Sequence, residues 1–286
     1  MDKVSAPPAR PPLLQSVLAL PLPRSYLNFV GRQIFRFLQT VQGLGAFALI
    51  TLGVTFTKFN SSWRVVHPLI RAQVDRAGVR LLPGIVLLGL ALGLVIVGQT
   101  VSLLQKIGAG QYAGTVMVTV LIRELGPLAT ALVVLARVGT AIVVELGLSR
   151  AQGEVEALEA LGIDPVHYLV MPRVLGLAAA IFSLTVYLIL VAVCSGYLFV
   201  FLQDVPLMPG DYFGQIARAL KWEDFALLGL KTATFGAIIA TVTCYQGLAQ
   251  RLRLEDVSDA TTRAVAQSVA GCVLADALFI VVYLLM

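Results

Sequence analysis

The sequence predicts an all-α integral membrane protein whose chain crosses the bilayer five times. Of its 286 residues, 58% are hydrophobic and only 13% are charged, and the mean hydropathy is +0.88. Soluble domains carry about a quarter charged residues, so this chain has too few charges to cover a water-facing surface. The composition therefore excludes a disordered chain, a coiled coil and almost any soluble enzyme.

Five apolar stretches are long enough to span a membrane, because a helix needs about 20 apolar residues to cross the hydrocarbon core. They lie at about residues 81–105, 112–147, 165–203, 225–250 and 264–286, and residues 81–286 form one transmembrane domain. Asp164 followed by Pro165 is typical of a helix start and opens the third stretch. As one helix the second stretch would be roughly 54 Å long, so we expect its C-terminal part to project beyond the bilayer.

The N-terminal region has a different character. Residues 1–23 are rich in proline and predict a loose tail. Residues 24–80 predict an interfacial helix followed by a cytoplasmic connector, because apolar and polar residues take opposite faces from Tyr26 onward. The uncharged run 37–57 leaves a sixth span open as the alternative. Basic residues on both of its flanks favour the same, cytoplasmic side for both.

The basic residues also predict the orientation of the chain. Arginines gather in the N-terminal region and in the loop 251–263, which places the N-terminus in the cytoplasm and the C-terminus outside. The segment 204–224 then lies outside, where Tyr212 to Leu220 can form a short surface helix. The net charge of +5 reports this topology and does not indicate a nucleic-acid partner.

Arg123 and Glu124 are the most unusual residues of the apolar stretches. They lie about a dozen residues into the second stretch, roughly 16–18 Å deep at the helical rise, where charges face protein or water rather than lipid. Pro127 follows and predicts a kink. One interpretation is a buried ion pair that locks helices together. The other is the polar floor of a cavity that receives the headgroup of an amphiphile.

The loop after the second stretch predicts a short helix at 151–161 with an acidic face. Glu154, Glu156 and Glu159 alternate with apolar residues such as Leu158. The pattern fits either a solvated helix or a helix that docks on a basic groove of a cytoplasmic partner.

Enzymatic chemistry has no visible motif. No phosphate-binding loop of the form G-x-x-x-x-G-K-[ST] occurs, so the chain has no motif of that kind for ATP. Cys194, Cys244 and Cys272 lie in apolar runs without the spacing of metal ligands. Gly89 and Gly93 in the first stretch permit close approach of a neighbouring helix. We therefore expect neither a catalytic site nor a cofactor or metal.

A set of short motifs resembles a known family. They are Arg123-Glu-Leu-Gly-Pro127, Arg137-Val-Gly139, Glu145-Leu-Gly147, Ala157-Leu-Glu159, Asp164-Pro165, Pro172-Arg173 and Ala260-Thr-Thr-Arg263. With these motifs in this order, the chain from about residue 40 to its end resembles the MlaE/YrbE family of ABC transporter permeases.

The resemblance implies a function and partners. Permeases of this family form homodimers in a bacterial inner membrane and work with a separate cytoplasmic ATPase, which binds the ATP. A periplasmic MCE-domain protein and often a STAS-domain subunit complete a system that moves phospholipids or other hydrophobic molecules between membranes. Two other functions stay open: an ion-coupled secondary transporter with Arg123, Glu124 and Asp276 as a relay, and a membrane scaffold that anchors a periplasmic protein.

The resemblance also implies site residues. Lipid binding is carried over to Val97, Gln99, Val101, Leu104, Arg123 and Glu124, and ATPase coupling to Glu154, Glu156, Leu158 and Glu159. Two departures from the family pattern stand out. Gly153 is expected to weaken the coupling helix by up to about 1 kcal/mol, and Val101 replaces an aromatic residue of the cavity wall.

Overall fold

The computed structural model describes residues 42–51, 53, 63–203, 208–248 and 256–285. The predicted tail 1–23 and the predicted helix from residue 24 up to 41 lie outside these ranges. Contacts divide the chain into the units Met1–Ala46 and Phe47–Met286. Apart from the start of the helix Gln42–Thr51, the second unit holds every element discussed below, and its described residues form helices and turns without a strand.

Five helical runs in the described residues are long and apolar enough to cross a membrane, which confirms the predicted fold class. They are His67–Lys106, Gly110–Ala151, Val166–Leu202, Trp222–Leu248 and Val257–Leu285. The helix Gln42–Thr51 is apolar but has only 10 residues, too few for a span. A sixth crossing is therefore absent from the part of the chain that the structure describes.

Two of the runs start at least seven residues earlier than the apolar pattern alone predicted. The first continues back through α3 (Trp63–Ala77), which the sequence analysis treated as part of a connector. The fifth, α13, begins at Val257 rather than at residue 264. In both cases a helix continues past the apolar region into a polar segment, because helical hydrogen bonding does not end where hydrophobicity ends.

The first two runs combine α-helix with other helical turns. The first run contains α3, the 3-10 turn η1 (Val79–Leu81), α4 (Leu82–Leu92), the π-helical turn η2 (Gly93–Val97) and α5 (Gly98–Lys106). The second contains η3 (Gly110–Tyr112), α6 (Ala113–Met117), the π-helical segments η4 (Val118–Leu125) and η5 (Leu135–Gly139), and α7 (Gly126–Val134) and α8 (Thr140–Ala151). Such π-helical segments are rare and occur frequently at functional sites.

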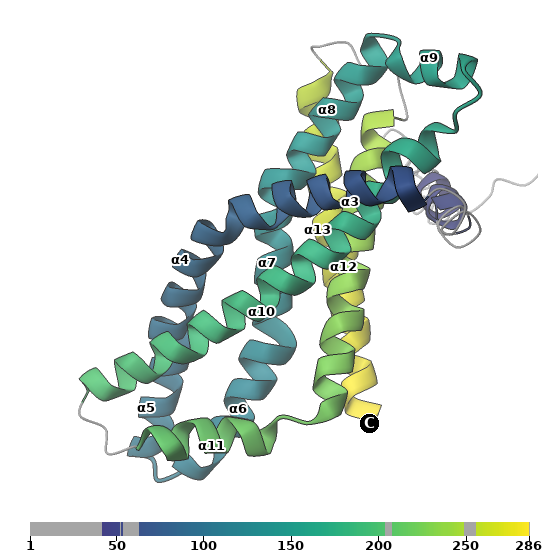
Figure 1. Ribbon diagram of the computed structural model, residues 1–286. Coiled ribbons are helices and arrows are strands. Elements are labelled where there is room, and N and C mark those ends of the chain that lie inside the picture. Colours follow the sequence, from purple (N-terminus) through teal and green to yellow (C-terminus); the bar gives the residue numbers. More distant parts are fainter. Residues whose placement is uncertain (1–41, 52, 54–62, 204–207, 249–255, 286) are drawn as a thin grey trace, which may run out of the picture. The chain divides into compact units, whose positions relative to one another are not determined.

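The remaining elements complete the bundle. They are α9 (Glu154–Ala160), the π-helical turn η6 (Val166–Val170), α10 (Met171–Leu202), α11 (Pro209–Ala219), α12 (Trp222–Leu248) and α13. The long helix α10 packs against α3, α4, α7 and α12, while α12 packs against α8 and α13 (Figure 1). The short helix α11, predicted as Tyr212 to Leu220, lies against α6.

A seam of small residues lets the first run approach α10 closely. A Cβ atom at Gly93 would lie 1.9 Å from the Ser195 Oγ and 2.2 Å from the Ala192 carbonyl oxygen. A Cβ at Gly89 would meet Val191 at 3.1 Å. The close approach that the Gly89–Gly93 spacing predicted is therefore confirmed, and its partner is α10 of the same chain.

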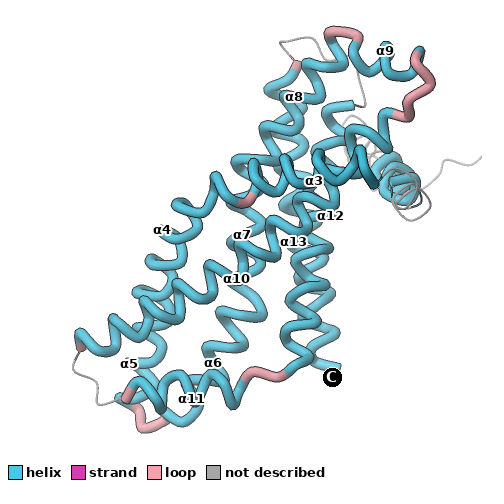
Figure 2. The backbone as a smooth tube through the Cα atoms, viewed as in Figure 1, coloured by secondary structure: helices cyan, strands magenta, loops and turns pink. Residues whose placement is uncertain are grey.

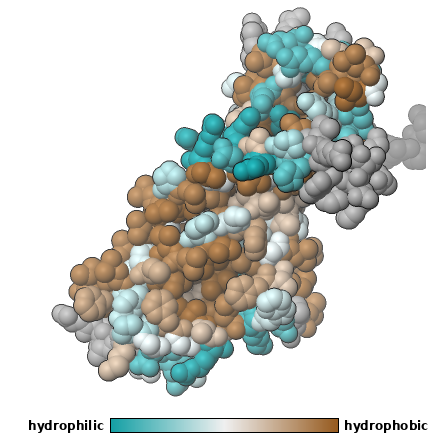
Figure 3. Space-filling view, in the orientation of Figure 1, coloured by the Kyte–Doolittle hydropathy of each residue, from teal (hydrophilic) through white to brown (hydrophobic). Residues whose placement is uncertain are grey.

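The polar ends and the apolar middle are separated on the surface. On the face shown in Figure 3, hydrophobic residues cover α4, α5 and α10, while hydrophilic residues lie over α3 at one end and α11 at the other. Arg71, Arg76 and Arg80 of the α3–η1 segment are exposed. This distribution is that of a membrane protein whose apolar band faces lipid.

The predicted helix at 151–161 is present but shorter, as α9. Gly153 stands before it with φ +80° and caps it, so the expected cost of a glycine inside the helix does not arise; instead glycine fits the left-handed turn between α8 and α9. The predicted helix start at Asp164–Pro165 is confirmed, because the Val166 N–H donates to the Asp164 Oδ1 at 3.0 Å.

Candidate functional site

The local backbone around Arg123 and Glu124 departs from a regular α-helix. Both residues lie in the π-helical segment η4, which ends at Leu125, directly before Gly126 and Pro127. Proline has no N–H to donate to the carbonyl four residues earlier, and for Pro127 that carbonyl belongs to Arg123. In a regular α-helix that carbonyl would therefore lack its usual donor.

Lys231 of α12 is a donor to the Arg123 carbonyl. Its side chain is 0% exposed, and its Nζ donates to the Arg123 carbonyl oxygen at 2.8 Å. The same Nζ lies 2.8 Å from the Glu124 Oε2 and 2.7 Å from the Asp276 Oδ1 of α13. One ammonium group thus joins the second, fourth and fifth spanning runs.

Arg123 points to different partners. Its Nε lies 2.8 Å from the Oδ1 of Asp224, and its guanidinium carbon stands 4.9 Å from the ring centroid of Tyr283, a cation–π contact. Asp224 also accepts a bond from the Lys221 N–H at 2.9 Å and so caps the start of α12. Its side chain is only 3% exposed. Arg123 thereby joins the second run to both of the last two.

We call Arg123, Glu124, Asp224, Lys231 and Asp276 the intramembrane charge network. Two cations face three carboxylates in it, and buried charges require such pairing because an unpaired one costs several kcal/mol, of order 3–5. The interpretation of an ion pair that locks helices together is confirmed. Arg123 and Glu124 nevertheless keep 25% and 28% of their side chains exposed, so both still reach the surface of the single chain.

Three of the network's residues were not predicted from the sequence as members of a site. Asp224 and Lys231 were not considered, and Asp276 was given only an alternative role in a relay. The signal was present, because an ionisable residue inside an apolar run needs a partner, and the chain offers only a few. The sequence does not say which charges meet, since the partners are far apart in the chain; Glu124 and Lys231, for example, are separated by 107 positions.

The predicted lipid-binding residues of the first run fall into two groups. Val97 and Val101 are buried and pack with Ala113, Met117 and Ala192 of α6 and α10, and Leu104 is partly buried against them. Gln99 is exposed. In the single chain, therefore, Val97 and Val101 face other helices of the same chain, whereas Gln99 lies on the opposite, open face.

The predicted ATPase-coupling residues lie together on α9. Glu154 and Glu159 are exposed, and Glu156 and Leu158 are partly exposed. Val155 is buried and belongs to the main core, which holds α9 to the bundle. A cavity of about 360 Å³ lies beside it, lined by Arg150, Glu156, Glu159, Tyr245 and Leu248 among others.

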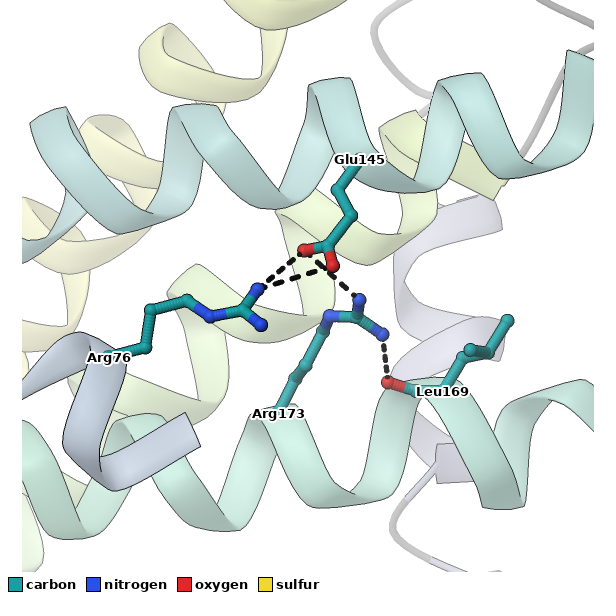
Figure 4. Close-up of polar contacts among 4 residues, drawn as sticks. All are labelled: Arg76, Glu145, Leu169 and Arg173. Atoms are coloured by element: carbon teal, nitrogen blue, oxygen red, sulfur yellow. Dashed lines mark hydrogen bonds and ion pairs between the residues drawn. The ribbon is translucent and has the colours of Figure 1, made fainter. Parts of the chain in front are cut away.

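A second ion cluster lies near the α9 end. Glu145 of α8 bonds Arg76 of α3 at 3.0 Å and lies 3.4 Å from Arg173 of α10 (Figure 4). In the sequence, Glu145 and Arg173 both lie in motifs shared with the family. Arg137, two turns earlier on the same run, is exposed. In the described part of the chain, His, Cys, Asp and Glu side chains nowhere group in a way that would hold a metal ion.

Comparison of the chain with protein-family models finds a matching family. The permease MlaE family matches residues 70–282, which include the whole intramembrane charge network and α9.

Curated proteins from bacteria and a plant are similar to the chain. It is 30% identical over 246 residues to a probable ABC transporter permease protein of Rickettsia typhi, covering 84% of this chain and 91% of that one. It is 28% identical over 242 residues to the intermembrane phospholipid transport system permease protein MlaE of Haemophilus influenzae, covering 84% and 90%.

The plant relative is longer than the matched region. The chloroplastic protein TRIGALACTOSYLDIACYLGLYCEROL 1 of Arabidopsis thaliana is 31% identical over 206 residues, which are 71% of this chain and 58% of that protein. The match thus spans less than two thirds of this relative's length.

Proposed function

Because the chain belongs to the MlaE permease family, we propose that it is the membrane subunit of an ATP-driven transporter that moves phospholipids or related hydrophobic molecules. One observation carries the proposal: the family match covers residues 70–282, nearly all of the spanning part. The name of the Haemophilus influenzae relative, an intermembrane phospholipid transport system permease, supports the substrate class.

The ATPase is a separate cytoplasmic protein that docks on α9. The helix presents Glu154 and Glu159 to solvent at the end of the bundle that carries the exposed arginines of α3. Since basic residues mark the cytoplasmic side, this end lies in the cytoplasm, and α11 and the C-terminus lie on the periplasmic side of a bacterial inner membrane. Acidic side chains on a short helix suit a basic groove of the partner.

The lipid pathway forms between two copies of the chain. An exposed stripe runs along the first spanning run through Leu87, Val95, Gln99 and Leu103. Its apolar residues suit acyl chains, and Gln99 supplies a hydrogen-bonding group among them. In a homodimer, two such faces enclose a chamber, whereas Val97 and Val101 line it only if α5 separates from α6 and α10 during transport.

Arg123 serves the lipid headgroup. Its guanidinium is held by Asp224 and Tyr283, yet the Arg123 side chain stays 25% exposed, so the group has donors left for a phosphate oxygen. Arginine–phosphate contacts are charge-assisted and geometrically selective. A periplasmic MCE-domain carrier then exchanges lipid with the chamber, and a STAS-domain subunit can accompany the ATPase.

The first test is transport by the complex in vesicles of phosphatidylethanolamine and phosphatidylglycerol, with mass spectrometry of the lipids that co-purify. We expect ATP-dependent lipid movement by the native complex and its loss in Arg123→Ala. Because this change leaves Asp224 unpaired, the matched control is Asp224→Asn with Arg123 kept, which should retain transport. Glu124→Lys should also abolish transport while the dimer still forms.

Four outcomes would contradict the proposal. Normal lipid flux in Arg123→Ala and Glu124→Lys would remove the headgroup role. A monomeric permease, or an α9 that labelling reagents reach from the periplasmic side, would remove the chamber or the docking site. A purified complex that retains no lipid and whose ATP hydrolysis never responds to lipid would favour a scaffold.

A second candidate is an ion-coupled transporter. The observation that favours it is the contact of one buried ammonium, Lys231, with two carboxylates, Glu124 and Asp276, because intramembrane carboxylates form proton relays in pumps and transporters. Lipid movement measured with and without ATP, and with and without a proton gradient, separates the two. Movement driven by the gradient alone would replace the ATP-driven reading.

A further inference from the structure

The ion cluster around Glu145 has no role in the lipid pathway proposed above. The Arg76 Nη1 donates to both carboxylate oxygens of Glu145, at 3.2 and 3.0 Å. The Arg173 Nη2 lies 3.4 Å from the Glu145 Oε2, and its Nη1 donates to the Leu169 carbonyl at 2.7 Å (Figure 4). One carboxylate therefore touches side chains from two other elements, and Arg173 is itself anchored to its own helix.

The cluster lies at the base of the projection that carries α9. Glu145 stands six residues before the last residue of α8, Ala151, and Arg173 stands seven residues after the first residue of η6, Val166. The segment between them runs out through α9 and back, as the tube in Figure 2 shows. The Glu145–Arg173 pair thus links the segment that enters this projection to the segment that leaves it.

Arg76 stands where α3 turns into the first span. It is the penultimate residue of α3, and Gly78 is the first residue after that helix. The Gly78 N–H donates to the Val74 carbonyl at 2.7 Å, and a Cβ atom at Gly78 would lie only 2.7 Å from that oxygen. Beyond this tight point the chain continues through η1 into α4. A displacement of Arg76 therefore reaches the start of the first span directly.

The contact is a side-chain bridge between elements with different neighbours. The backbone of α3 packs on α10, whereas α8 packs on α12, α13 and α9. Arg76 and Glu145 are 49% and 43% exposed, and exposed ion pairs contribute little to stability. The bridge is thus poorly suited to stabilising the fold and well placed to transmit movement.

We propose that Glu145 is a positioning residue of the transport cycle, whose carboxylate transmits a displacement of α9 to α3 and the first span through Arg76 and Arg173. The inference rests on the proposed function, since it presumes that the ATPase acts on α9. It adds a route from that contact to the lipid pathway.

The test compares ATP hydrolysis and lipid movement in one preparation. The complex is purified with its own ATPase and placed in vesicles of phosphatidylethanolamine and phosphatidylglycerol. In Glu145→Gln, which keeps the shape but removes the charge, we expect the ATPase rate to stay within about twofold and the lipid moved per ATP to fall about tenfold. Glu223→Gln, an exposed glutamate at the start of α12, is the matched control and should change neither.

A second readout distinguishes transmission from a merely structural role. Hydrogen exchange is measured for α9 and α3 with and without a non-hydrolysable ATP analogue. In the native complex both helices should respond to nucleotide. In Glu145→Gln, α9 should still respond while α3 does not. Arg76→Gln should also disconnect α3 from α9, and the double variant should be no worse than Glu145→Gln alone, because Glu145→Gln already removes the contact with Arg76.

The outcomes distinguish a failure of this inference from a failure of the proposed function. A native complex that moves no lipid with ATP defeats the proposed function, and the exchange measurement still tests the bridge. If the native complex works and Glu145→Gln keeps its lipid-to-ATP ratio, or loses both activities in proportion, the inference is wrong. If Glu145→Gln does not assemble, Arg76→Gln, which leaves the Arg173 contact in place, gives the decision by the same two readouts.

Discussion

The Lys231 Nζ lies 2.8 Å from the carbonyl oxygen of Arg123, the carbonyl to which Pro127 has no N–H to donate. A residue of α12 thereby bonds the backbone of the second spanning run. The same ammonium pairs with Glu124 and Asp276. One side chain therefore bonds both a backbone carbonyl and two carboxylates, and it joins the second, fourth and fifth spanning runs.

Replacing Lys231 should be among the most damaging single changes in the chain. In Lys231→Met the carboxylates of Glu124 and Asp276 lose their shared partner inside the bundle, at a cost of about 3–5 kcal/mol. Thermal unfolding of the detergent-purified protein measures the loss. Lys106→Met, which removes an exposed lysine, is the control. A triple variant that also carries Glu124→Gln and Asp276→Asn should recover much of the stability, and a triple variant as unstable as Lys231→Met would contradict the pairing.

The contribution of the hydrogen bond from Lys231 to the Arg123 carbonyl can be isolated by a change at Pro127. Pro127→Ala restores an N–H that can donate to the Arg123 carbonyl within the helix. Lys231→Met should then cost less in the Pro127→Ala background than in the native chain, by about 0.5–1.5 kcal/mol, the net worth of one hydrogen bond. A double-mutant cycle on unfolding free energies measures the difference. Strict additivity of the two changes would show that the carbonyl does not depend on Lys231.

The glycine seam between the first span and α10 makes a steric prediction. In Gly93→Ala the new methyl group would lie 1.9 Å from the Ser195 Oγ, so the helices must separate, at about 1–3 kcal/mol. Gly84→Ala is the matched control in the same run, because a Cβ there meets nothing within 4 Å. The control should be neutral or stabilising by up to about 1 kcal/mol. Equal melting temperatures for the two variants would contradict the close packing.

Tyr212 predicts an alkaline limit to stability at the α11 end. Its hydroxyl donates to the Val193 carbonyl at 3.0 Å, and burial, followed by the charge of Cys194, raises its pKa above the usual value of about 10. A raised pKa means that the neutral form is favoured by folding, so this stabilisation is complete below about pH 10 and is lost as the pH rises beyond it. Tyr212→Phe should lower stability by about 1 kcal/mol at neutral pH and weaken its fall above pH 10. An unchanged alkaline profile in Tyr212→Phe would place the titrating group elsewhere.

The sequence by itself determined the fold class and the spanning segments. Too few charges for a water-facing surface, and five apolar stretches of sufficient length, leave only a bundle of membrane helices. Local chemistry also determined the start of the third run at Asp164. These features follow from residues close together in the chain, so a single sequence reveals them.

Only the tertiary structure decided which charges meet. Arg123 and Glu124 are adjacent in sequence, yet one pairs with Asp224 and the other with Lys231, because neighbours on a helix point in different directions. The same holds for Glu145, whose partners Arg76 and Arg173 come from α3 and α10. Hydrophobic burial depends on local composition. An ion pair depends instead on where two helices cross. Those crossings are set by side-chain packing, such as the close approach at Gly93.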